Sequence, residues 1–418
     1  MSARARPFRT WTFRAGPVPW ALLGLTALAL ILRTALVLHH QDMGWQLRDD
    51  AAMYHVLAGN LRHGVFSMFH PQDIPDTIKR PGYPWLVHLT GNSVLLTLLL
   101  QSLLSALKVP LVHILGRTLG LRTPFALAAA ALMAIEPMDI LLSAQLLTEA
   151  VFGTLVLAGT VMLVRGGRWP AWAGAALLFG AAAWVRPNGL ALALVAGAAA
   201  AIWLRHGMAR SAVFIGLVLL AVLPWALRNH RVMGRFHMGE SAVVAAGYYQ
   251  VPQVLRAAGD DRGHRWRQVW NGRASAMDWT DRTAYHAFFD DLRAEVRATL
   301  RAHPLTWARV HAEKAARIAV APGRGHIALF FRRNGIAANA LIAVSLGFSL
   351  LVLFGTGGAV FHWRTVPRGV WLLLLMSAAL IAMGAITTAD ARFKNPAMGL
   401  LVVAACWAMQ RWGERRSA

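Results

Sequence analysis

Long apolar blocks separated by short, arginine-rich segments are the feature that most constrains the fold of this 418-residue chain. Hydrophobic residues make up 57% of the sequence and charged residues 15%, whereas a soluble protein carries about 25% charged residues. A helix needs about 20 apolar residues to cross a bilayer. The pattern therefore predicts an all-α integral membrane protein with about ten transmembrane helices, at 20–38, 93–115, 124–142, 145–164, 170–185, 187–204, 211–227, 336–361, 369–388 and 396–411.

Arginines in the short loops predict the orientation, because short basic loops stay cytoplasmic. By this rule both termini are inside, and the long segments 39–92 and 228–335 are outside. We divide the chain into an N-terminal membrane module (1–227), an extracytoplasmic segment (228–335) and C-terminal transmembrane helices (336–418). The arginines that carry this prediction are Arg4, Arg6, Arg9, Arg14, Arg117, Arg122, Arg165, Arg168, Arg205, Arg210, Arg364, Arg368, Arg411, Arg415 and Arg416.

The formal net charge of +23 would suggest a nucleic-acid partner in a soluble protein. Here the basic residues cluster between apolar blocks, so topology and anionic lipid explain them better, and no nucleic acid is expected. The single cysteine, Cys406, excludes a disulfide framework and a cysteine metal site. Walker, Rossmann and HExxH motifs are absent, which argues against a nucleotide-using cytoplasmic enzyme. Almost all basic residues are arginine; the lysines are Lys79, Lys108, Lys314 and Lys394.

An acidic pair, Asp49 and Asp50, follows the first apolar block. Residues 50–63 show a helical period, which predicts an amphipathic helix on the membrane surface. One interpretation of the pair is helix capping. The other is chemical: Asp50, one turn before Tyr54, accepts a proton from a hydroxyl nucleophile if burial raises its basicity. The predicted apolar face is Met53, Val56, Leu57 and Leu61.

Two basic motifs border apolar blocks. Lys79 and Arg80 precede a rigid Pro-Gly-Tyr-Pro turn, and Arg228 and Asn229 end the seventh block. Snorkelling toward lipid headgroups explains either motif. A clamp on the phosphate of a lipid-linked substrate explains them equally, since arginine binds phosphate in bidentate geometry.

Charged residues inside or beside the apolar blocks form a third group. Each costs about 2.5–3.5 kcal/mol at a helix centre. We place Glu149 one to two turns inside the fourth span, and Arg186 with Asn188 at the junction of the fifth and sixth. All fall on the predicted outer side, which favours a polar cavity there, although structural pairing, as of Glu149 with Arg186, remains open for each residue. The other members are Glu136, Asp139, Asp390, Arg392 and Lys394. In the segment 228–335 we predict helix near 281–320 and loop at 252–280.

In this order and spacing, short motifs resemble those of the GT-C membrane glycosyltransferases, in particular bacterial relatives of protein O-mannosyltransferases and of the lipid A aminoarabinose transferase. The resemblance covers most of the chain. The motifs are Asp50-x-x-x-Tyr54 with Leu57-Ala58, Arg-Pro-Gly-Tyr-Pro at 80–84, Leu-Leu-Thr-Glu at 146–149, Arg-Pro-Asn-Gly at 186–189, Pro-Trp with Arg-Asn at 224–229, Gly-Arg-Phe at 234–236 and Arg-Phe-Lys-Asn-Pro at 392–396.

The resemblance implies inverting transfer of a sugar from a polyprenyl phosphate, such as undecaprenyl phosphate, to a hydroxyl acceptor at the outer face of the bacterial cytoplasmic membrane. It implies that Asp50, or its neighbour Asp49, is the base, with Glu149 a further acid of unassigned role that holds a metal or the acceptor. Lys79, Arg80, Arg228 and Arg392 would bind the donor phosphate. The implied substrate-binding residues are Tyr54, Tyr83, Arg186, Asn188 and Asn229.

Three matters stay open from the sequence. Use of a divalent cation is one. The acceptor, a glycolipid, polysaccharide or protein, is another, because the chain has no separate C-terminal soluble domain of the kind that some relatives carry. The third is the class of protein: a flippase of a lipid-linked glycan, or a polymerase or ligase of surface polysaccharide, would also have many spans and basic outer segments.

Overall fold

The computed structural model describes residues 19–69, 74–204, 207–332 and 335–416. Within these ranges the chain is helical, and its extended pairing is limited to one isolated antiparallel bridge between Ser67 and Pro75. The predicted all-α membrane class is therefore confirmed. The orientation residues Arg4, Arg6, Arg9, Arg14 and Arg205, and the side chain of Arg416, lie outside what the structure describes.

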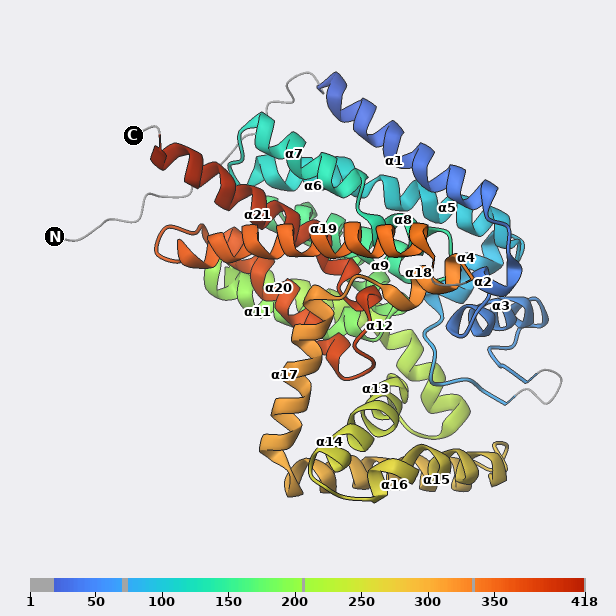
Figure 1. The fold of residues 1–418 in the computed structure, drawn as a ribbon. Helices are drawn as coiled ribbons and strands as arrows, with labels where there is room; N and C mark the ends of the chain where they lie inside the picture. Colours follow the sequence, from blue (N-terminus) through green and yellow to red (C-terminus); the bar gives the residue numbers. More distant parts are fainter. Residues whose placement is uncertain (1–18, 70–73, 205–206, 333–334, 417–418) are drawn as a thin grey trace.

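A bundle of long helices forms the larger part of the molecule (Figure 1). Its core is one continuous apolar cluster rich in alanine and leucine, to which α21 contributes an almost unbroken buried stretch from 397 to 408. The helices are α1 (Trp20–His39), α5 (Val94–Ala106), α6 (Lys108–Thr118), α7 (Thr123–Ala134), α8 (Pro137–Ser143), α9 (Glu149–Arg165), α10 (Trp169–Val185), α11 (Asn188–Trp203), α12 (Gly207–Met233), α19 (Ile336–Phe361), α20 (Arg368–Ala385) and α21 (Asn395–Arg416).

Fewer helices than predicted have the length and apolarity of a membrane span. Five described spans meet both conditions, one of them the continuous pair α5–α6, and a sixth is α7 with α8 if that pair counts as one span bent by 47°. Pro137 at the first position of α8 accounts for the bend, since a proline breaks the helical hydrogen-bond ladder. Helices α10 and α11 are apolar but shorter, and Pro187 separates them. The predicted count of ten is thus not established by length and composition.

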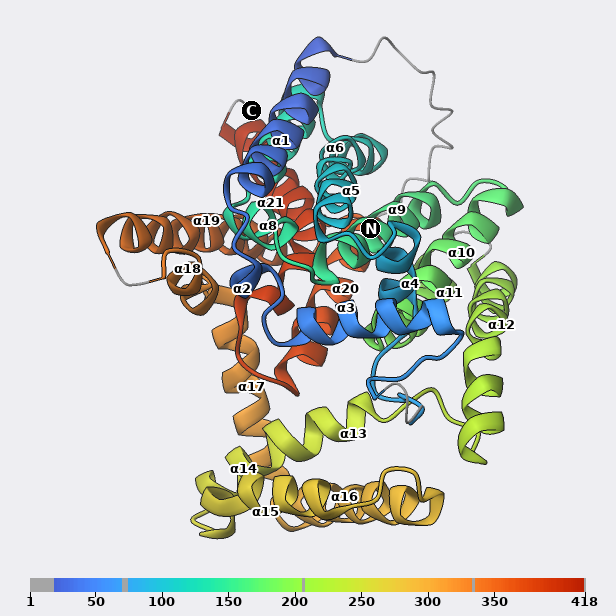
Figure 2. The same ribbon diagram turned by 90° about the vertical axis from the view of Figure 1, so that its right-hand side faces the viewer.

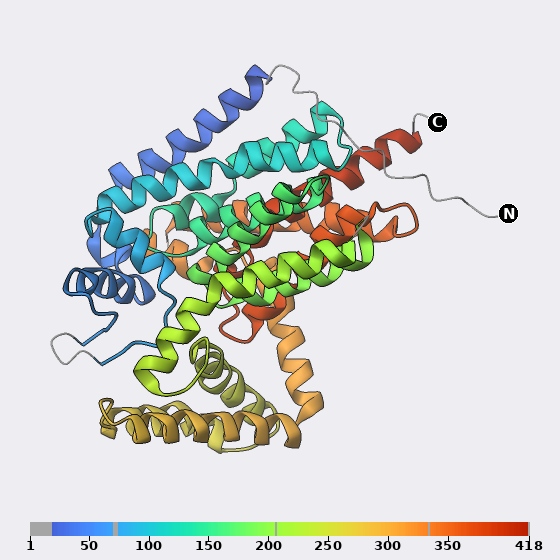
Figure 3. The ribbon, with the colours of Figure 1, turned by 180° about the vertical axis from the view of Figure 1, so that it is seen from behind.

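A second layer of helices lies beyond one end of the bundle and is reached through α12 and α17 (Figures 1 and 3). The prediction of helix at 281–320 is confirmed, with a break at His303–Pro304. The prediction of loop at 252–280 is wrong, because Trp266 and Trp270, four residues apart, bury one helical face. The layer comprises α13 (Ser241–Ala245), the π-turn η2 (Ala246–Gln250), α14 (Val251–Ala257), α15 (Arg262–Ala276), α16 (Arg282–Ala302) and α17 (Pro304–Val320), followed by α18 (Arg324–Phe330).

Between α1 and α5 the chain forms α2 (Met43–Gln46), α3 (Asp50–Asn60), η1 (Leu61–His63) and α4 (Gly82–Leu89). The predicted helix is present, and Figure 2 shows it at the end of the bundle that faces α13. Its predicted apolar face is only partly correct. Leu57 is buried, but Val56 is 40% exposed, and the contact with α4 uses Ala58, whose carbonyl is 3.1 Å from Nδ1 of His88. Aromatic side chains contribute to the same contact, since Tyr54 of α3 packs against Tyr83 of α4.

Charged side chains are buried inside the bundle as one network. The Arg33 guanidinium of α1 donates to Oδ2 of Asp139 at 2.7 Å and to Ser105 Oγ at 2.7 Å, and Lys108 donates to the other Asp139 oxygen. All of these side chains are at most 3% exposed. The network ties α1, α6 and α8 together in the apolar core, so Asp139 is a structural ion-pair partner and does not line an open polar cavity.

The four lysines of the chain share one property: each is engaged in the interior. Lys79 and Lys108 pair with carboxylates. Lys394 donates to Ser349 Oγ and to the carbonyl of Ala321, both at 2.6 Å. Lys314, on α17, donates to Oε1 of Gln250 at 2.8 Å, and its nitrogen is 3.4 Å from the carbonyl of Ile386. Lys314 therefore joins the second layer to the end of α20.

The folding stability of the protein is expected to depend on the titration of Lys314. Burial, with a smaller contribution from Arg267, lowers the pKa of Lys314 to about 8. An unfolded lysine titrates near about 10.4, so between about pH 8 and 10 the unfolded chain binds more protons and stability rises with pH. Lys314→Met should remove this rise, measured as the difference between the two proteins in chemical unfolding in detergent. Equal slopes in both proteins would contradict the assignment.

Candidate active site

Asp50 is the centre of the charged cluster at this end of the bundle. Its Oδ1 accepts from Lys79 Nζ at 2.6 Å, and its Oδ2 is 3.1 Å from a guanidinium nitrogen of Arg392. The three residues come from α3, from the loop before α4 and from the short helix η3 (Ala391–Phe393). Segments that are more than 300 residues apart in sequence thus meet at one carboxylate.

Backbone geometry separates the two neighbouring acids. Asp49 has a positive φ of 54°, its side chain makes no capping hydrogen bond, and it is 82% exposed beside Arg48. Asp50, the first residue of α3, turns inward and is 30% exposed. The structure therefore brings Asp50 and not Asp49 into the cluster, and a side-chain cap does not explain the acidic pair.

The electrostatics fix Asp50 as an anion. Burial alone would raise its pKa, but the charges of Lys79 and Arg392 outweigh burial and hold the pKa well below its ordinary value. The raised basicity that a proton acceptor needs is consequently absent while both cations are in place. It would return only if another anion drew Lys79 and Arg392 away from the carboxylate.

Glu149 and Arg186 form a second ion pair next to the first, with Arg186 Nη1 2.8 Å from Glu149 Oε1. Glu149 is the first residue of α9, not one to two turns inside the helix as predicted, because 145–148 are not helical. Arg186 follows the end of α10, where Pro187 stops the helix. Phe393 links the two pairs: the guanidinium groups of Arg186 and Arg392 lie 5.7 and 4.9 Å from its ring centroid.

The pKa of Arg392 also shows that these acids lie close to it. Burial alone would lower its pKa, but the carboxylates of Glu149, Asp50 and Asp390 raise it. Asp390 caps the short helix η3 that carries Arg392, since its Oδ1 accepts the main-chain N–H of Arg392 at 2.9 Å. Asp50, Glu149, Arg186 and Arg392 therefore form one electrostatic cluster.

Two tyrosines border the cluster on the side of α4. The rings of Tyr54 and Tyr83 pack edge to face at 5.0 Å, and Lys79 Nζ is 5.3 Å from the centre of the Tyr54 ring. Burial raises the pKa of Tyr54, so its hydroxyl stays neutral. The Tyr83 hydroxyl donates to Gln101 Oε1. Tyr83 is fully buried and acts as packing for Tyr54, while Tyr54 faces the charged groups.

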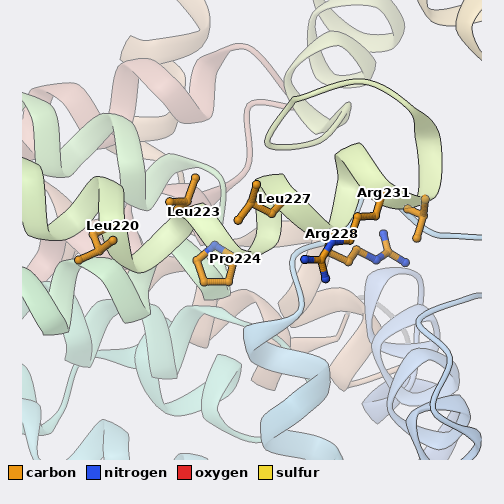
Figure 4. Close-up of a pocket in the computed structure, with 7 residues that line it drawn as sticks. Leu220, Leu223, Pro224, Leu227, Arg228 and Arg231 are labelled. Atoms are coloured by element: carbon orange, nitrogen blue, oxygen red, sulfur yellow. The ribbon is translucent and has the colours of Figure 1, made fainter.

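A separate groove of about 380 Å³ follows one side of α12 (Figure 4). Leu220, Leu223, Pro224 and Leu227 line its apolar part, and Arg228 and Arg231 stand at its polar end. Helix α12 continues to Met233, so Arg228 lies within the helix and does not close it. The groove thus combines an apolar surface along the C-terminal half of α12 with two guanidinium groups.

Arg228 is held by backbone carbonyls of the segments 64–69 and 74–81, between η1 and α4. Its Nη1 donates to Asp76 O at 2.9 Å and its Nη2 to Phe66 O at 3.3 Å, and its guanidinium lies 4.8 Å from the Trp225 ring. Asn229 accepts from Arg228 Nη1 with its Oδ1 at 3.0 Å and donates with its Nδ2 to His237 O at 3.0 Å. Asn229 is completely buried, and its side chain joins Arg228 to the connection between α12 and α13.

Arg80 lies apart from the Asp50 cluster, although Lys79 precedes it. Its guanidinium donates to Met238 O, and its Nε has no hydrogen-bond partner among the described residues. Burial lowers the pKa of Arg80 to about 10. Asn188 is the first residue of α11, two residues after Arg186. Sequence reasoning missed Arg231, Phe393 and Asp76; Arg231, one turn after Arg228 on the same helical face, could have been found from that spacing.

A divalent cation does not fit the acids that the structure brings together. Among the described residues no three His, Cys, Asp or Glu side chains are grouped as metal ligands. Both oxygens of Asp50 face protein cations, and Glu149 pairs with Arg186. A metal ion would have to displace these cations, and we assign it no step.

Comparison with protein-family models and with curated proteins finds no match. Solved structures do match. The oligosaccharyltransferase AglB from Archaeoglobus fulgidus, in complex with an inhibitory peptide and a dolichol-phosphate, aligns over 95% of this chain and 51% of its own, with a TM-score of 0.54 and 17% identity. The Archaeoglobus fulgidus oligosaccharyltransferase tethered with an acceptor peptide aligns over 95% and 50%, with a TM-score of 0.53 and 14% identity.

The chain has the GT-C fold. The resemblance seen in the sequence is thereby confirmed at the level of fold. The chain spans about half the length of the oligosaccharyltransferases that it matches. ArnT from Cupriavidus metallidurans bound to undecaprenyl phosphate is also similar, over 93% of this chain and 78% of its own, at 14% identity and a TM-score of 0.42.

Proposed function

We propose that this protein is a membrane glycosyltransferase that transfers a sugar from a polyprenyl phosphate to a hydroxyl acceptor. The observation that carries the proposal is the α12 groove, whose apolar wall ends in Arg228 and Arg231. Arg228 donates to the carbonyl of Asp76, and Lys79, three residues after Asp76, donates to Asp50. The GT-C fold supports it, as does the dolichol-phosphate bound by the similar AglB. The orientation rule for short basic loops supports an active site on the extracytoplasmic face, with both termini cytoplasmic.

The donor lipid would lie with its isoprenoid chain along the leucines of α12 and its phosphate at Arg228 and Arg231. Guanidinium groups suit this role, because they offer fixed pairs of donors to phosphate oxygens. In a bacterium the lipid would be undecaprenyl phosphate. Lys79 and Arg392 would meet the phosphate from the other side, on the face occupied by Asp50.

The reaction follows from the charges of the cluster. The acceptor oxygen attacks the anomeric carbon, and the bond from that carbon to the phosphate oxygen breaks with inversion, leaving the electron pair on the lipid phosphate. Lys79 and Arg392, drawn toward the phosphate, stabilise the growing negative charge. Asp50, released from its ion pairs, regains basicity and accepts the hydroxyl proton. Glu149 would keep Arg186 and Arg392 oriented, and Tyr54 would border the sugar.

Donor affinity is expected to depend on Arg231, which is exposed and lines the groove. A hydrogen bond to a charged group contributes about 1.5–3 kcal/mol, so Arg231→Gln should raise the KM for the donor about tenfold or more with little change in kcat. The measurement is the transfer rate at varied donor concentration. Arg235→Gln is the matched control: Arg235 lies just beyond the end of α12, where it forms an exposed pair with Asp290, and its loss should leave KM unchanged.

The experiment that tests the function is comparative mass spectrometry of surface lipids, polymers and proteins with and without the gene, followed by transfer with purified protein in vesicles. A missing hexose or pentose that the purified protein restores would establish transfer and name the sugar and acceptor. A glycan that is made but fails to cross the membrane would instead indicate a flippase. Loss of chain length without loss of a sugar would indicate a polymerase or ligase.

A further inference from the structure

Asp76 lies where the described segments 64–69 and 74–81 contact each other. Its N–H donates to Phe66 O at 2.9 Å, next to the bridge between Ser67 and Pro75. Its side-chain Oδ1 accepts the N–H groups of Ile78 at 2.9 Å and of Lys79 at 2.8 Å. A carboxylate that accepts backbone N–H groups two and three residues ahead fixes a turn, and here the turn determines the direction in which Lys79 leaves the backbone.

The main chain of the same residue holds the other cation. Asp76 O accepts from Arg228 Nη1 at 2.9 Å, and Phe66 O, which Asp76 N–H also contacts, accepts from Arg228 Nη2 at 3.3 Å. Asp76 therefore fixes the backbone of Lys79 through its side chain. Its carbonyl, together with Phe66 O and Asn229 Oδ1, fixes the guanidinium of Arg228. Lys79 belongs to the Asp50 cluster and Arg228 to the groove, so Asp76 connects the two parts of the site.

The opposite side of the loop is fixed against the second layer. Thr77 O accepts the N–H of Glu240 at 3.1 Å. Gly239 has a φ of +128°, and a Cβ at that position would lie 2.4 Å from Thr77 O, so only glycine permits this approach. Residues 76–79 are consequently held between two rigid elements, and the turn at Asp76 determines how the cations are spaced between them.

We propose that Asp76 is a positioning residue of the donor site, which sets the distance and direction between the two phosphate-binding cations Lys79 and Arg228. The inference rests on the proposed function. It requires the acceptor oxygen of Asp76 and not its charge, because both side-chain contacts are to neutral backbone N–H groups. Asparagine offers the same acceptor at the same position and forms the same turn.

The test compares Asp76→Ala with Asp76→Asn, using undecaprenyl phosphate as the probe in a binding titration and the donor KM and kcat in the transfer assay. Asp76→Ala should weaken binding of undecaprenyl phosphate and raise the donor KM about tenfold or more. Asp76→Asn should bind the probe as well as the wild type or better, because the acceptor remains and a negative charge beside the phosphate is removed. If Asp76 had a purely structural role, its substitution would alter unfolding, but the two variants would not differ in this way in probe binding and donor KM.

Asp278→Ala is the matched control. Asp278 Oδ1 accepts from Thr280 N at 2.8 Å in a similar turn between α15 and α16, away from both cations, so its loss should leave binding unchanged. If Asp76→Ala does not fold, Asp76→Ser, with a single shorter acceptor, takes its place and should show an intermediate loss.

The outcomes separate the two proposals. Normal binding by Asp76→Ala, or equal losses in the alanine and asparagine variants, would overturn the role of Asp76 and leave the proposed function standing. A wild-type protein that binds no undecaprenyl phosphate would overturn both.

Discussion

Asp50→Asn is expected to abolish sugar transfer while leaving the protein folded. Asparagine cannot accept the hydroxyl proton, and general-base catalysis contributes typically about 10²–10⁴-fold to rate. The substitution also removes the carboxylate that pairs with Lys79 and Arg392, so the two cations lose their counter-ion before the donor binds. The measurement is kcat for transfer in vesicles, with binding of undecaprenyl phosphate as a second readout, which should be retained or strengthened because the phosphate no longer competes with Asp50.

Asp49→Asn is the control for this experiment, since Asp49 is adjacent in sequence but 82% exposed. Its kcat should match that of the wild type within about twofold. Equal losses in both variants, or full activity in Asp50→Asn, would contradict the assignment of the base.

Asp139→Ala is expected to destabilise the fold strongly. The substitution leaves Arg33 and Lys108 in the apolar core without the carboxylate that both contact. Removal of one partner from a buried ion pair costs about 3–5 kcal/mol. Unfolding of the purified protein in detergent measures the effect. The change should be smaller when charges are removed together, as in Asp139→Asn with Lys108→Met, because fewer uncompensated cations remain.

Asp290→Ala provides the comparison at the surface. Its pair with Arg235 is 47% exposed on both sides, and such pairs contribute about 0–1 kcal/mol. If the variants of Asp139 and Asp290 unfolded at the same denaturant concentration, the buried network would have no structural role.

The sequence was sufficient to predict the class of fold and that charged groups gather at one end of the helices. Apolar length predicted the membrane helices, and the coincidence of Asp50, Glu149, Arg186 and Arg392 on one predicted side anticipated the cluster in which they meet. The pair of Glu149 with Arg186 was among the alternatives, and it is present at 2.8 Å.

Other features depend on tertiary contacts that short-range patterns do not contain. Lys79 and Arg80 are adjacent and both basic, yet Lys79 reaches Asp50, whereas Arg80 reaches the carbonyl of Met238 in the connection between α12 and α13. Asp50 is less basic because it pairs with two cations, and one of them, Arg392, is 342 residues away in the chain. The helix at 262–276 was within reach of the sequence, since Trp266 and Trp270 have helical spacing.

The interior location of all four lysines has a practical consequence. Amine-selective reagents would find no side-chain ammonium group that is freely solvated in the native protein, since Lys108, Lys314 and Lys394 are at most 3% exposed and Lys79 is covered by Asp50 and Tyr54. The rate at which Lys108 and Lys394 acquire label would then measure opening of the bundle. In the same experiment, comparing the labelling of Lys79 with and without bound lipid would measure how much of the site is occupied.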